Sequence, residues 1–185
     1  MRALLNRLRR GLARALLHRI VFGEAGAPHS RIAPSTCIEG ESGLQLADHV
    51  FIGQFNFIDA TAGLVIEEGV QITNFVSIVT HSSHRAIRLL GRSYASLKGT
   101  PPGYVKASIH IGAFSFIGPH SLIEAGARVG RGCVVCAYAQ VRGDVPDFAI
   151  VAGQPAKVIG DVRERDAELL KQYPELAAHY KELFT

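Results

Sequence analysis

The chain contains few of the residues that mark disulfide-bonded or membrane-spanning proteins. Its 185 residues include three cysteines, an odd number that argues against a disulfide framework and favours a reducing compartment. No apolar run approaches the ~18 residues that a membrane span needs, and the N-terminus lacks the apolar centre and cleavage site of a signal peptide. Charged residues make up 19% and hydrophobic residues 48%, the balance of one modest domain. These absences predict a cytoplasmic protein.

Aliphatic residues recur every six positions in the second half of the chain. They are Ile111, Ile117, Ile123, Val129, Val135 and Val141. No helix or ordinary strand has this period, which is typical of a parallel β-helix. A small residue follows four positions later, as at Ser115 and Ala127, where the chain must turn a corner beside the inward side chain. Gly112 and Gly118 are expected to supply corner dihedrals that other residues reach only with strain.

The same period continues upstream with two slips of two residues each. It runs through Ile32, Ile38, Leu44 and Val50, restarts at Ile52 and Ile58, and restarts again at Ile66, Ile72 and Ile78. Each slip fits a bulge at a corner of the prism that the stacked strands form. The period is lost over residues 79–108, a stretch that contains Pro101 and Pro102. We expect a long loop extruded from the prism, usually a functional feature, with a disordered insertion as the alternative.

The repeat stops after Val145, and residues 161–184 read as a helix that Pro174 kinks or splits. We expect this tail to pack against its own prism or a neighbouring subunit and to carry no chemistry. The resulting division is an N-terminal basic amphipathic helix with linker, a β-helix domain and a C-terminal helical tail, at residues 1–30, 31–160 and 161–185.

Acidic residues are absent from the first 23 positions, yet six of the chain's 20 basic residues lie there. They are Arg2, Arg7, Arg9, Arg10, Arg14 and Arg19. The net charge of the whole chain is +4, so its basic character comes from this segment alone. Leucines and arginines fall on opposite sides at helical spacing, which predicts an amphipathic helix within residues 1–20. Two roles stay open: the leucines cap the open end of the prism, or the helix lies on an anionic membrane, at its inner face.

Two histidines stand where the loop leaves the prism. His81 and His84 lie in the segment Thr-His-Ser-Ser-His, directly after the last aliphatic anchor before the loop. A neutral imidazole is the natural acceptor of a hydroxyl proton at neutral pH. The structural alternative is that both side chains only hydrogen-bond loop backbone. Because a flat prism offers no deep pocket, we expect a site where the loop projects, against the face of an adjacent subunit.

Two segments match a known repeat family. Residues 144–159 resemble its terminal segment almost residue for residue, and Thr80 to His84 is similar to its histidine-bearing loop. Over about residues 31–160 the chain resembles the hexapeptide-repeat acyltransferases, in the branch of the sugar and polysaccharide O-acetyltransferases. The resemblance implies an all-β core, a left-handed parallel β-helix with terminal helices and an extruded loop. It also implies acetyl-CoA as donor, no metal, a homotrimer and active sites between subunits.

The resemblance assigns catalysis to His84, with His81 as second choice because it lies nearer the last anchor than is usual. The base would take the proton of an acceptor hydroxyl while that hydroxyl attacks the thioester, without a covalent acyl-enzyme. Donor contacts are carried over to Ala137, Arg142, Gly153 and Lys157. Phe116 stands where the family usually has Trp, and Gly143 and Gly160 where it often has basic residues. These departures leave the acyl group and the affinity for CoA open.

Acceptor contacts are expected from the prism and from the loop. Asn56 and Asp59 are similar to the acceptor-binding stretch of the galactoside and maltose enzymes, although an Asn can also serve a corner turn. The loop supplies Arg85 and Tyr94, in a stretch of five basic residues and no acidic one. This charge and the ring surface favour an anionic acceptor such as a nucleotide sugar, a glycolipid precursor or an acidic polysaccharide. No nucleic-acid partner is expected.

Two other classes of protein use the same prism. The γ-type carbonic anhydrases bind a metal through three histidines, and His81, His110 and His120 invite the comparison. That family expects two ligands five residues apart, whereas His110 and His120 are ten apart. A non-catalytic β-helix scaffold is the second alternative, and the donor segment ending in Lys157 disfavours it. Metal analysis would distinguish the first alternative from an acyltransferase, and a measurement of CoA binding would distinguish the second.

Overall fold

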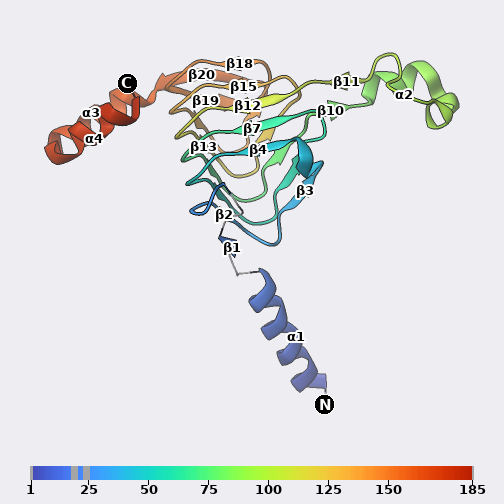
Figure 1. Cartoon of the computed structure of the whole chain (residues 1–185), viewed down its shortest axis with the longest axis horizontal. Coiled ribbons are helices and arrows are strands. Elements are labelled where there is room, and N and C mark those ends of the chain that lie inside the picture. Colours follow the sequence, from blue (N-terminus) through green and yellow to red (C-terminus); the bar gives the residue numbers. More distant parts are fainter. Residues whose placement is uncertain (1, 18–20, 23–25, 185) are drawn as a thin grey trace.

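Residues 2–17, 21–22 and 26–184 are described in a computed structural model. Within these ranges the strands wind into stacked coils that form a three-sided prism, with helices at both ends and a segment projecting from one side (Figure 1). The predicted fold class, a left-handed parallel β-helix of hexapeptide repeats, is confirmed. The core of the prism is a single cluster of aliphatic side chains, mostly Ile, Val and Leu.

Each side of the prism is one sheet. The first sheet contains β1 (Val21–Phe22), β2 (Arg31–Ile32), β5 (Phe51–Ile52), β8 (Gln71–Ile72), β13 (Phe116–Ile117), β16 (Val134–Val135), β19 (Ala149–Gly153) and β20 (Ala156–Asp161). The second contains β3 (Cys37–Glu39), β6 (Phe57–Asp59), β9 (Ser77–Ile78), β14 (Leu122–Ile123) and β17 (Gln140–Val141). The third contains β4 (Leu44–Leu46), β7 (Leu64–Ile66), β12 (Ile109–Ile111), β15 (Arg128–Val129) and β18 (Asp144–Val145). Pairing is parallel except at β1 and β20, the two edges of the first sheet.

Register places one aliphatic side chain of each coil above that of the coil before. In the first sheet Ile32 pairs with Ile52, and Ile52 with Ile72. The six anchors from Ile111 to Val141 are at most 1% exposed. Each fully buried side chain of this kind stabilises the fold by roughly 1.5–3 kcal/mol. The six-residue period is therefore the core itself.

The first slip in the repeat lies earlier than the sequence period suggested. Leu46 pairs with Ile66, and Leu44 with Leu64, so the two added residues lie between β3 and β4. They do not follow Val50, which is buried at a corner directly before β5. Alternate residues of a strand share a side, so Leu44 and Leu46 both face inward. The six-residue period alone therefore cannot show which of the two is the anchor of this coil.

Aromatic residues and histidines share the corners with glycine. In the described part of the chain, seven non-glycine residues have φ between 56° and 63°: His49, Phe55, Phe75, Phe114, His120, Tyr138 and Phe148. Gly112 and Gly118 are not among the glycines with positive φ. A Cβ at Gly118 would lie 2.7 Å from the Ala137 nitrogen, so glycine is needed there for the close approach of two coils.

One corner, between the first and second sheets, carries a column of stacked rings. Ring centroids are 5.2 Å apart between Phe55 and Phe75, 4.9 Å between Phe75 and His120, and 4.8 Å between His120 and Tyr138. We call this column the aromatic corner. Offset stacking of this kind adds about 0.5–1.5 kcal/mol per pair beyond the burial of apolar area.

A second corner, between the second and third sheets, carries all the irregular passages. The chain crosses it from β3 to β4 through η1 (Glu41–Gly43), from β6 to β7, and from β9 to β12. The last passage is the extruded segment, which is folded: β10 (His81–Ser82), α2 (His84–Leu90), η2 (Gly91–Ser96) and β11 (Val105–Lys106). The antiparallel pair β10–β11 forms its neck, with His81 opposite Lys106 (Figure 1). We call this the site corner.

Helices lie at both ends of the chain. α1 (Arg2–Leu17) precedes the β1 edge strand, as predicted for a helix within residues 1–20. At the other end α3 (Val162–Gln172) is followed by η3 (Pro174–Leu176) and α4 (Ala177–Phe184), so the predicted helix is split at Pro174. Among the described residues, no helix combines the length and apolar character that crossing a membrane requires.

Candidate active site at the irregular corner

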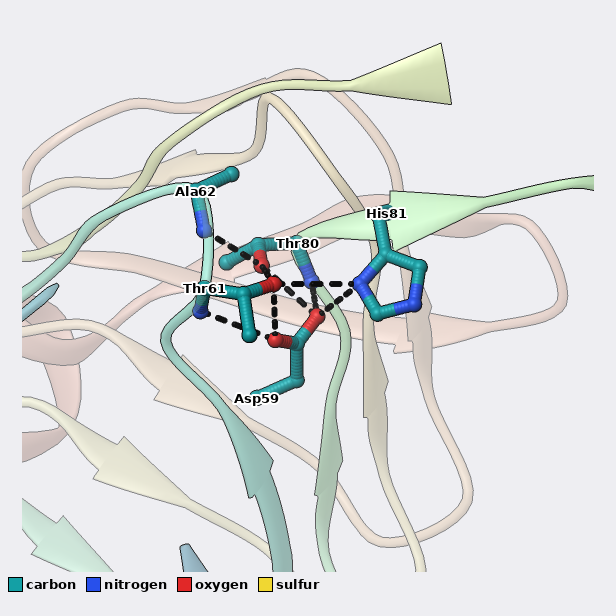
Figure 2. A network of polar contacts seen from close by, with 5 residues as sticks. All are labelled: Asp59, Thr61, Ala62, Thr80 and His81. Carbon is teal, nitrogen blue, oxygen red and sulfur yellow. Dashed lines mark hydrogen bonds and ion pairs between the residues drawn. The ribbon is translucent and has the colours of Figure 1, made fainter. Parts of the chain in front are cut away.

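A buried carboxylate organises the site corner (Figure 2). Asp59 ends β6, and its side chain is 1% exposed. Its Oδ1 accepts hydrogen bonds from the Thr61 backbone N–H at 2.9 Å and the Thr61 hydroxyl at 2.6 Å. Its Oδ2 accepts from the Thr80 N–H at 2.8 Å and the Thr80 hydroxyl at 2.7 Å. Four donors therefore hold the carboxylate in one orientation.

These hydrogen bonds keep Asp59 ionised. Burial alone would raise the pKa of the Asp59 carboxyl, but the bonds from Thr61 and Thr80 outweigh burial and hold that pKa well below its usual range. A negative charge is therefore fixed inside the prism wall near neutral pH.

His81 faces this charge. Its Nδ1 lies 2.7 Å from Asp59 Oδ2 and 3.3 Å from the Thr61 hydroxyl. The second ring nitrogen lies on the side of the ring away from Asp59 (Figure 2), and the side chain is 35% exposed. A carboxylate beside Nδ1 favours the tautomer with the proton on that nitrogen. Nε2 is then left as a proton acceptor directed away from the carboxylate.

Tyr104 covers one face of the His81 ring. The ring centroids are 5.6 Å apart and the planes differ by 12°. Burial, with smaller contributions from Tyr94 and Asp59, raises the pKa of the Tyr104 phenol above its ordinary value. Tyr104 thus stays neutral and keeps its O–H as a donor beside the imidazole.

Two hollows meet at His81. The first, of about 500 Å³, lies under the extruded segment and is lined by His81, Thr61, Tyr94, Tyr104 and Lys106, among others. We call it the loop-side hollow. The second, of about 510 Å³, runs along the prism, and its lining includes His81, His84, Leu122, Glu124 and Arg142. We call it the prism-side hollow. His81 is therefore the one residue shared by the linings of these two hollows.

His84 has a different environment. It begins α2, is exposed, and its Nδ1 lies 2.8 Å from the Ser82 hydroxyl. A neutral hydroxyl cannot hold a proton on Nδ1 by charge, as Asp59 does for His81. His84 lines the prism-side hollow but not the loop-side one.

Comparisons with known proteins point to one group. No protein-family model matches the chain. The Mycobacterium tuberculosis protein named "Probable acetyltransferase Rv3034c" is 30% identical over 138 residues, which are 75% of this chain and 44% of that protein. The chain thus spans less than half the length of this curated relative. A hexapeptide-repeat acetyltransferase of Vibrio cholerae, VCA0836, solved with acetyl coenzyme A, superposes with a TM-score of 0.63 at 25% identity, over 84% of this chain and 77% of that one.

Over its repeat region the chain is thus similar to hexapeptide-repeat acetyltransferases. A local match agrees with this assignment: a 2,3,4,5-tetrahydropyridine-2,6-dicarboxylate N-acetyltransferase of Staphylococcus aureus is 52% identical over 48 residues, 26% of this chain and 20% of that enzyme. AntD, an N-acyltransferase of Bacillus cereus solved with dTDP and 3-hydroxybutyryl-CoA, shares the fold at 16% identity, with a TM-score of 0.61 over 80% of this chain and 90% of that one.

In this structure the residues predicted to form the site fall into two separate groups. Tyr94 lines the loop-side hollow and Arg142 the prism-side hollow, where the Arg142 Nε donates to Glu124 Oε1 at 2.9 Å. Arg85 is exposed on α2, outside both linings. Tyr94 and Arg142 are therefore brought to His81, and Arg85 is not.

The other predicted donor residues gather elsewhere, beside the aromatic corner. Ala137 follows β16, Gly153 ends β19 beside it, and Lys157 pairs with Ala152 across the β19–β20 hairpin. All three predicted residues are exposed. The residues predicted to contact acetyl-CoA are thus divided: three lie here, and Arg142 lies at the site corner.

Asn56 serves a corner turn, the alternative that its sequence context left open. It is 2% exposed. Its Oδ1 accepts from the Val76 N–H at 2.7 Å, and its Nδ2 donates to the Gly53 carbonyl at 2.9 Å. Both ends of the amide are committed to backbone, so we do not place Asn56 in the proposed site.

The three histidines of the carbonic anhydrase alternative have separate partners. His110 Nε2 lies 2.9 Å from Glu67 Oε1, His120 stacks within the aromatic corner, and His81 pairs with Asp59. In the described parts of the chain, the one group of three metal-ligating side chains is His29, Asp48 and His49. Within one protomer the geometry gives this alternative no support.

Sequence reasoning missed Thr61 and Glu124. Thr61 lies beneath His81 because successive coils here are 20 residues long: Ile38, Ile58 and Ile78 are in register. Counting back 20 positions from His81 reaches Thr61, so the coil length was the signal that could have found it. Glu124 follows β14 and meets Arg142, which lies 18 residues later, one coil of the regular half.

Proposed function

We propose that this protein is an acetyl-CoA-dependent O-acetyltransferase whose acceptor is a hydroxyl of a sugar, a nucleotide sugar or a glycolipid precursor. The carrying observation is the contact of His81 Nδ1 with Asp59 Oδ2 at 2.7 Å, at the point where two hollows meet. The family and the acetyl-CoA complex of VCA0836 support the donor. The acceptor class rests on the chemistry of the loop-side hollow.

His81 is the base in this proposal, and His84 becomes the second candidate. Nε2 of His81 takes the proton of the acceptor hydroxyl while the hydroxyl oxygen forms a bond to the thioester carbon. Asp59 stabilises the imidazolium that results, because its negative charge lies beside Nδ1. As the tetrahedral intermediate collapses, the C–S bond breaks and the proton passes from Nε2 to the leaving sulfur. The products are the acetyl ester and free CoA.

The two hollows separate donor from acceptor. The prism-side hollow contains Arg142, the one predicted donor residue at this corner, so we place the thioester end of acetyl-CoA there. The loop-side hollow offers two tyrosine rings and Lys106, which suit a sugar that carries negative charge. The hydroxyl and the thioester then approach His81 from different sides, as direct transfer requires.

Both hollows are open to solvent within one protomer. The other residues predicted to contact acetyl-CoA lie at a different corner of the prism. We therefore propose a homotrimer in which the neighbouring subunit supplies Ala137, Gly153 and Lys157 to the same donor. Lys157 is exposed and can meet a CoA phosphate as a point charge. A fully active monomer in light scattering would refute this arrangement.

The test is release of free CoA from acetyl-CoA across a panel of sugars, nucleotide sugars and glycan lipids. With an acceptor found, His81→Ala should lower kcat by about 10²–10⁴-fold, the usual contribution of general base catalysis. His84→Ala is the matched control and should retain activity within about threefold. The assignment of the base fails if the two variants exchange these results, and the proposed activity fails if no acceptor supports turnover while CoA does not bind.

A further inference from the structure

Four leucines of α1 are not covered by the described part of the protein. Leu4, Leu5, Leu8 and Leu12 are 63%, 46%, 62% and 62% exposed. At ~100° per residue these four positions fall on one face of the helix. Within the described residues the face therefore does not cap the prism, which was one of its two predicted roles. An apolar face of this size needs another partner.

The rest of α1 is basic. At helical spacing the five arginines of α1 fall off the leucine face, and no acidic residue lies among the first 23 positions. Arg7 and Arg9 are exposed. A helix with leucines on one face and arginines on the other lies flat at a lipid–water interface, and arginines attract anionic headgroups.

Charge decides between a lipid surface and a second copy of the chain. Pairing two α1 helices through their leucines would cover the leucines but would leave the arginines of both copies without a negatively charged partner, because neither segment contains an acidic residue. An anionic lipid surface accepts the leucines and neutralises the arginines at the same time. We propose that α1 docks the protein on an anionic lipid surface, with its leucine face in the headgroup region. This proposal does not depend on acetyl transfer.

The docked helix leaves the candidate active site accessible. α1 is followed by β1, which pairs with β2 in the first coil, at the end of the prism opposite α3 (Figure 1). His81 follows β9, which is two coils beyond β3 of the first coil. Coils are about 4.8 Å apart, so the site lies about 10 Å further along the prism.

Vesicle flotation of the full-length protein tests the proposal. Vesicles of phosphatidylcholine with phosphatidylserine should bind at least tenfold more protein than vesicles of phosphatidylcholine alone. Raising the salt from 0.1 M to 1 M should weaken binding, because the screening length falls from ~10 Å to ~3 Å. Leu8→Glu should lower binding at least tenfold. Asn6→Glu, the matched control, adds the same charge off the leucine face and should lower it much less.

Three outcomes would overturn the proposal. Equal vesicle binding of the Leu8→Glu and Asn6→Glu proteins would show that binding depends on charge alone and not on the leucine face. A lower oligomeric state of Leu8→Glu in light scattering, without loss of vesicle binding, would assign the leucine face to a second copy. A lower Tm of Leu8→Glu alone, again with vesicle binding unchanged, would assign it to the prism.

Discussion

The aromatic corner and the site corner are built from the same coils, but the first stabilises the prism and the second forms the candidate site. At the aromatic corner four coils turn through a ring residue with φ between 58° and 60°, and neighbouring rings stack with centroids less than 5.3 Å apart. At the site corner two passages have added residues and a third extrudes a folded segment. The repeated geometry stabilises the prism, and the interrupted geometry creates room for a buried charge and an exposed imidazole.

The difference has a physical reason. A stacked repeat satisfies its backbone with identical hydrogen bonds in every coil, so its surface is flat and offers little concavity. Where the passage is longer, side chains such as Thr61 and Thr80 can turn inward and donate to Asp59. The comparison predicts that substitutions at the site corner change activity and that those at the aromatic corner change stability.

Asp59→Asn should have the largest effect. In the amide, an NH2 group replaces one of the two carboxylate oxygens and faces the donors of the threonines and His81. The kcat should therefore fall by about 10²–10⁴-fold, as for loss of general base catalysis. Asp48→Asn is the matched control, because Asp48 also accepts two backbone N–H groups and faces a histidine, His29, at 2.7 Å. Steady-state kinetics of both variants would contradict the comparison if they lost activity equally.

Phe75→Ala should lower stability without changing the chemistry. Phe75 contributes to two stacks and is 49% exposed. Its removal should lower the free energy of unfolding by about 1–3 kcal/mol, since each aromatic pair contributes about 0.5–1.5 kcal/mol beyond buried area. Urea unfolding measures the loss, and kcat should remain unchanged. A large fall in kcat at full stability would mean that the aromatic corner takes part in the reaction.

Thr61→Val separates the two corners with a smaller change. It removes a hydroxyl that donates to Asp59 and lies 3.3 Å from His81 Nδ1, so kcat should fall about tenfold, the equivalent of ~1.4 kcal/mol. Thr73→Val removes a comparable hydroxyl, which donates to the Ile117 carbonyl at 2.7 Å near the aromatic corner. It should lower Tm but leave kcat within about twofold, given that one hydrogen bond contributes roughly 1 kcal/mol to stability.

The pH dependence of stability should show the smallest effect. The pKa of Asp59 is lowered in the folded protein, so the stabilisation is complete above the unfolded value of 3.8 and is lost as pH falls below it towards the lower folded value. Between pH 5 and pH 3 the wild type should therefore lose more stability than Asp59→Asn, which lacks the titrating group. Thermal unfolding at several pH values measures this. Parallel curves would mean that Asp59 does not titrate differently on folding.

The sequence predicted the prism well because a single period governs its core. Every anchor from Ile111 to Val141 is buried as expected, whereas Leu44 was put in the wrong register because a strand has two inward positions. For the site, Asp59 and His81 were both singled out, but for unrelated roles. They are 22 positions apart, and their contact follows only from the coil length and the bend of the chain at that corner.

Other features depend on the fold of a whole segment. His84 was preferred because of the number of residues between it and the last aliphatic anchor. That number does not show which of the two imidazoles lies beside a carboxylate. The position of Tyr104 on the His81 ring depends on the antiparallel return of β11 beside β10. No local pattern encodes such a return over more than twenty residues.

That return has a consequence for how the protein can change. β10 and β11 lie side by side, with His81 opposite Lys106, and the Ala107 N–H donates to the Thr80 carbonyl at 3.0 Å. The segment between them, residues 83–104, is therefore a cassette whose two ends are already joined. It can be exchanged for one of another length without altering the path of the chain through the prism. In the proposed reaction the position of the base and the choice of acceptor are thus separable, and a cassette of different sequence would change the acceptor without moving the His81 imidazole.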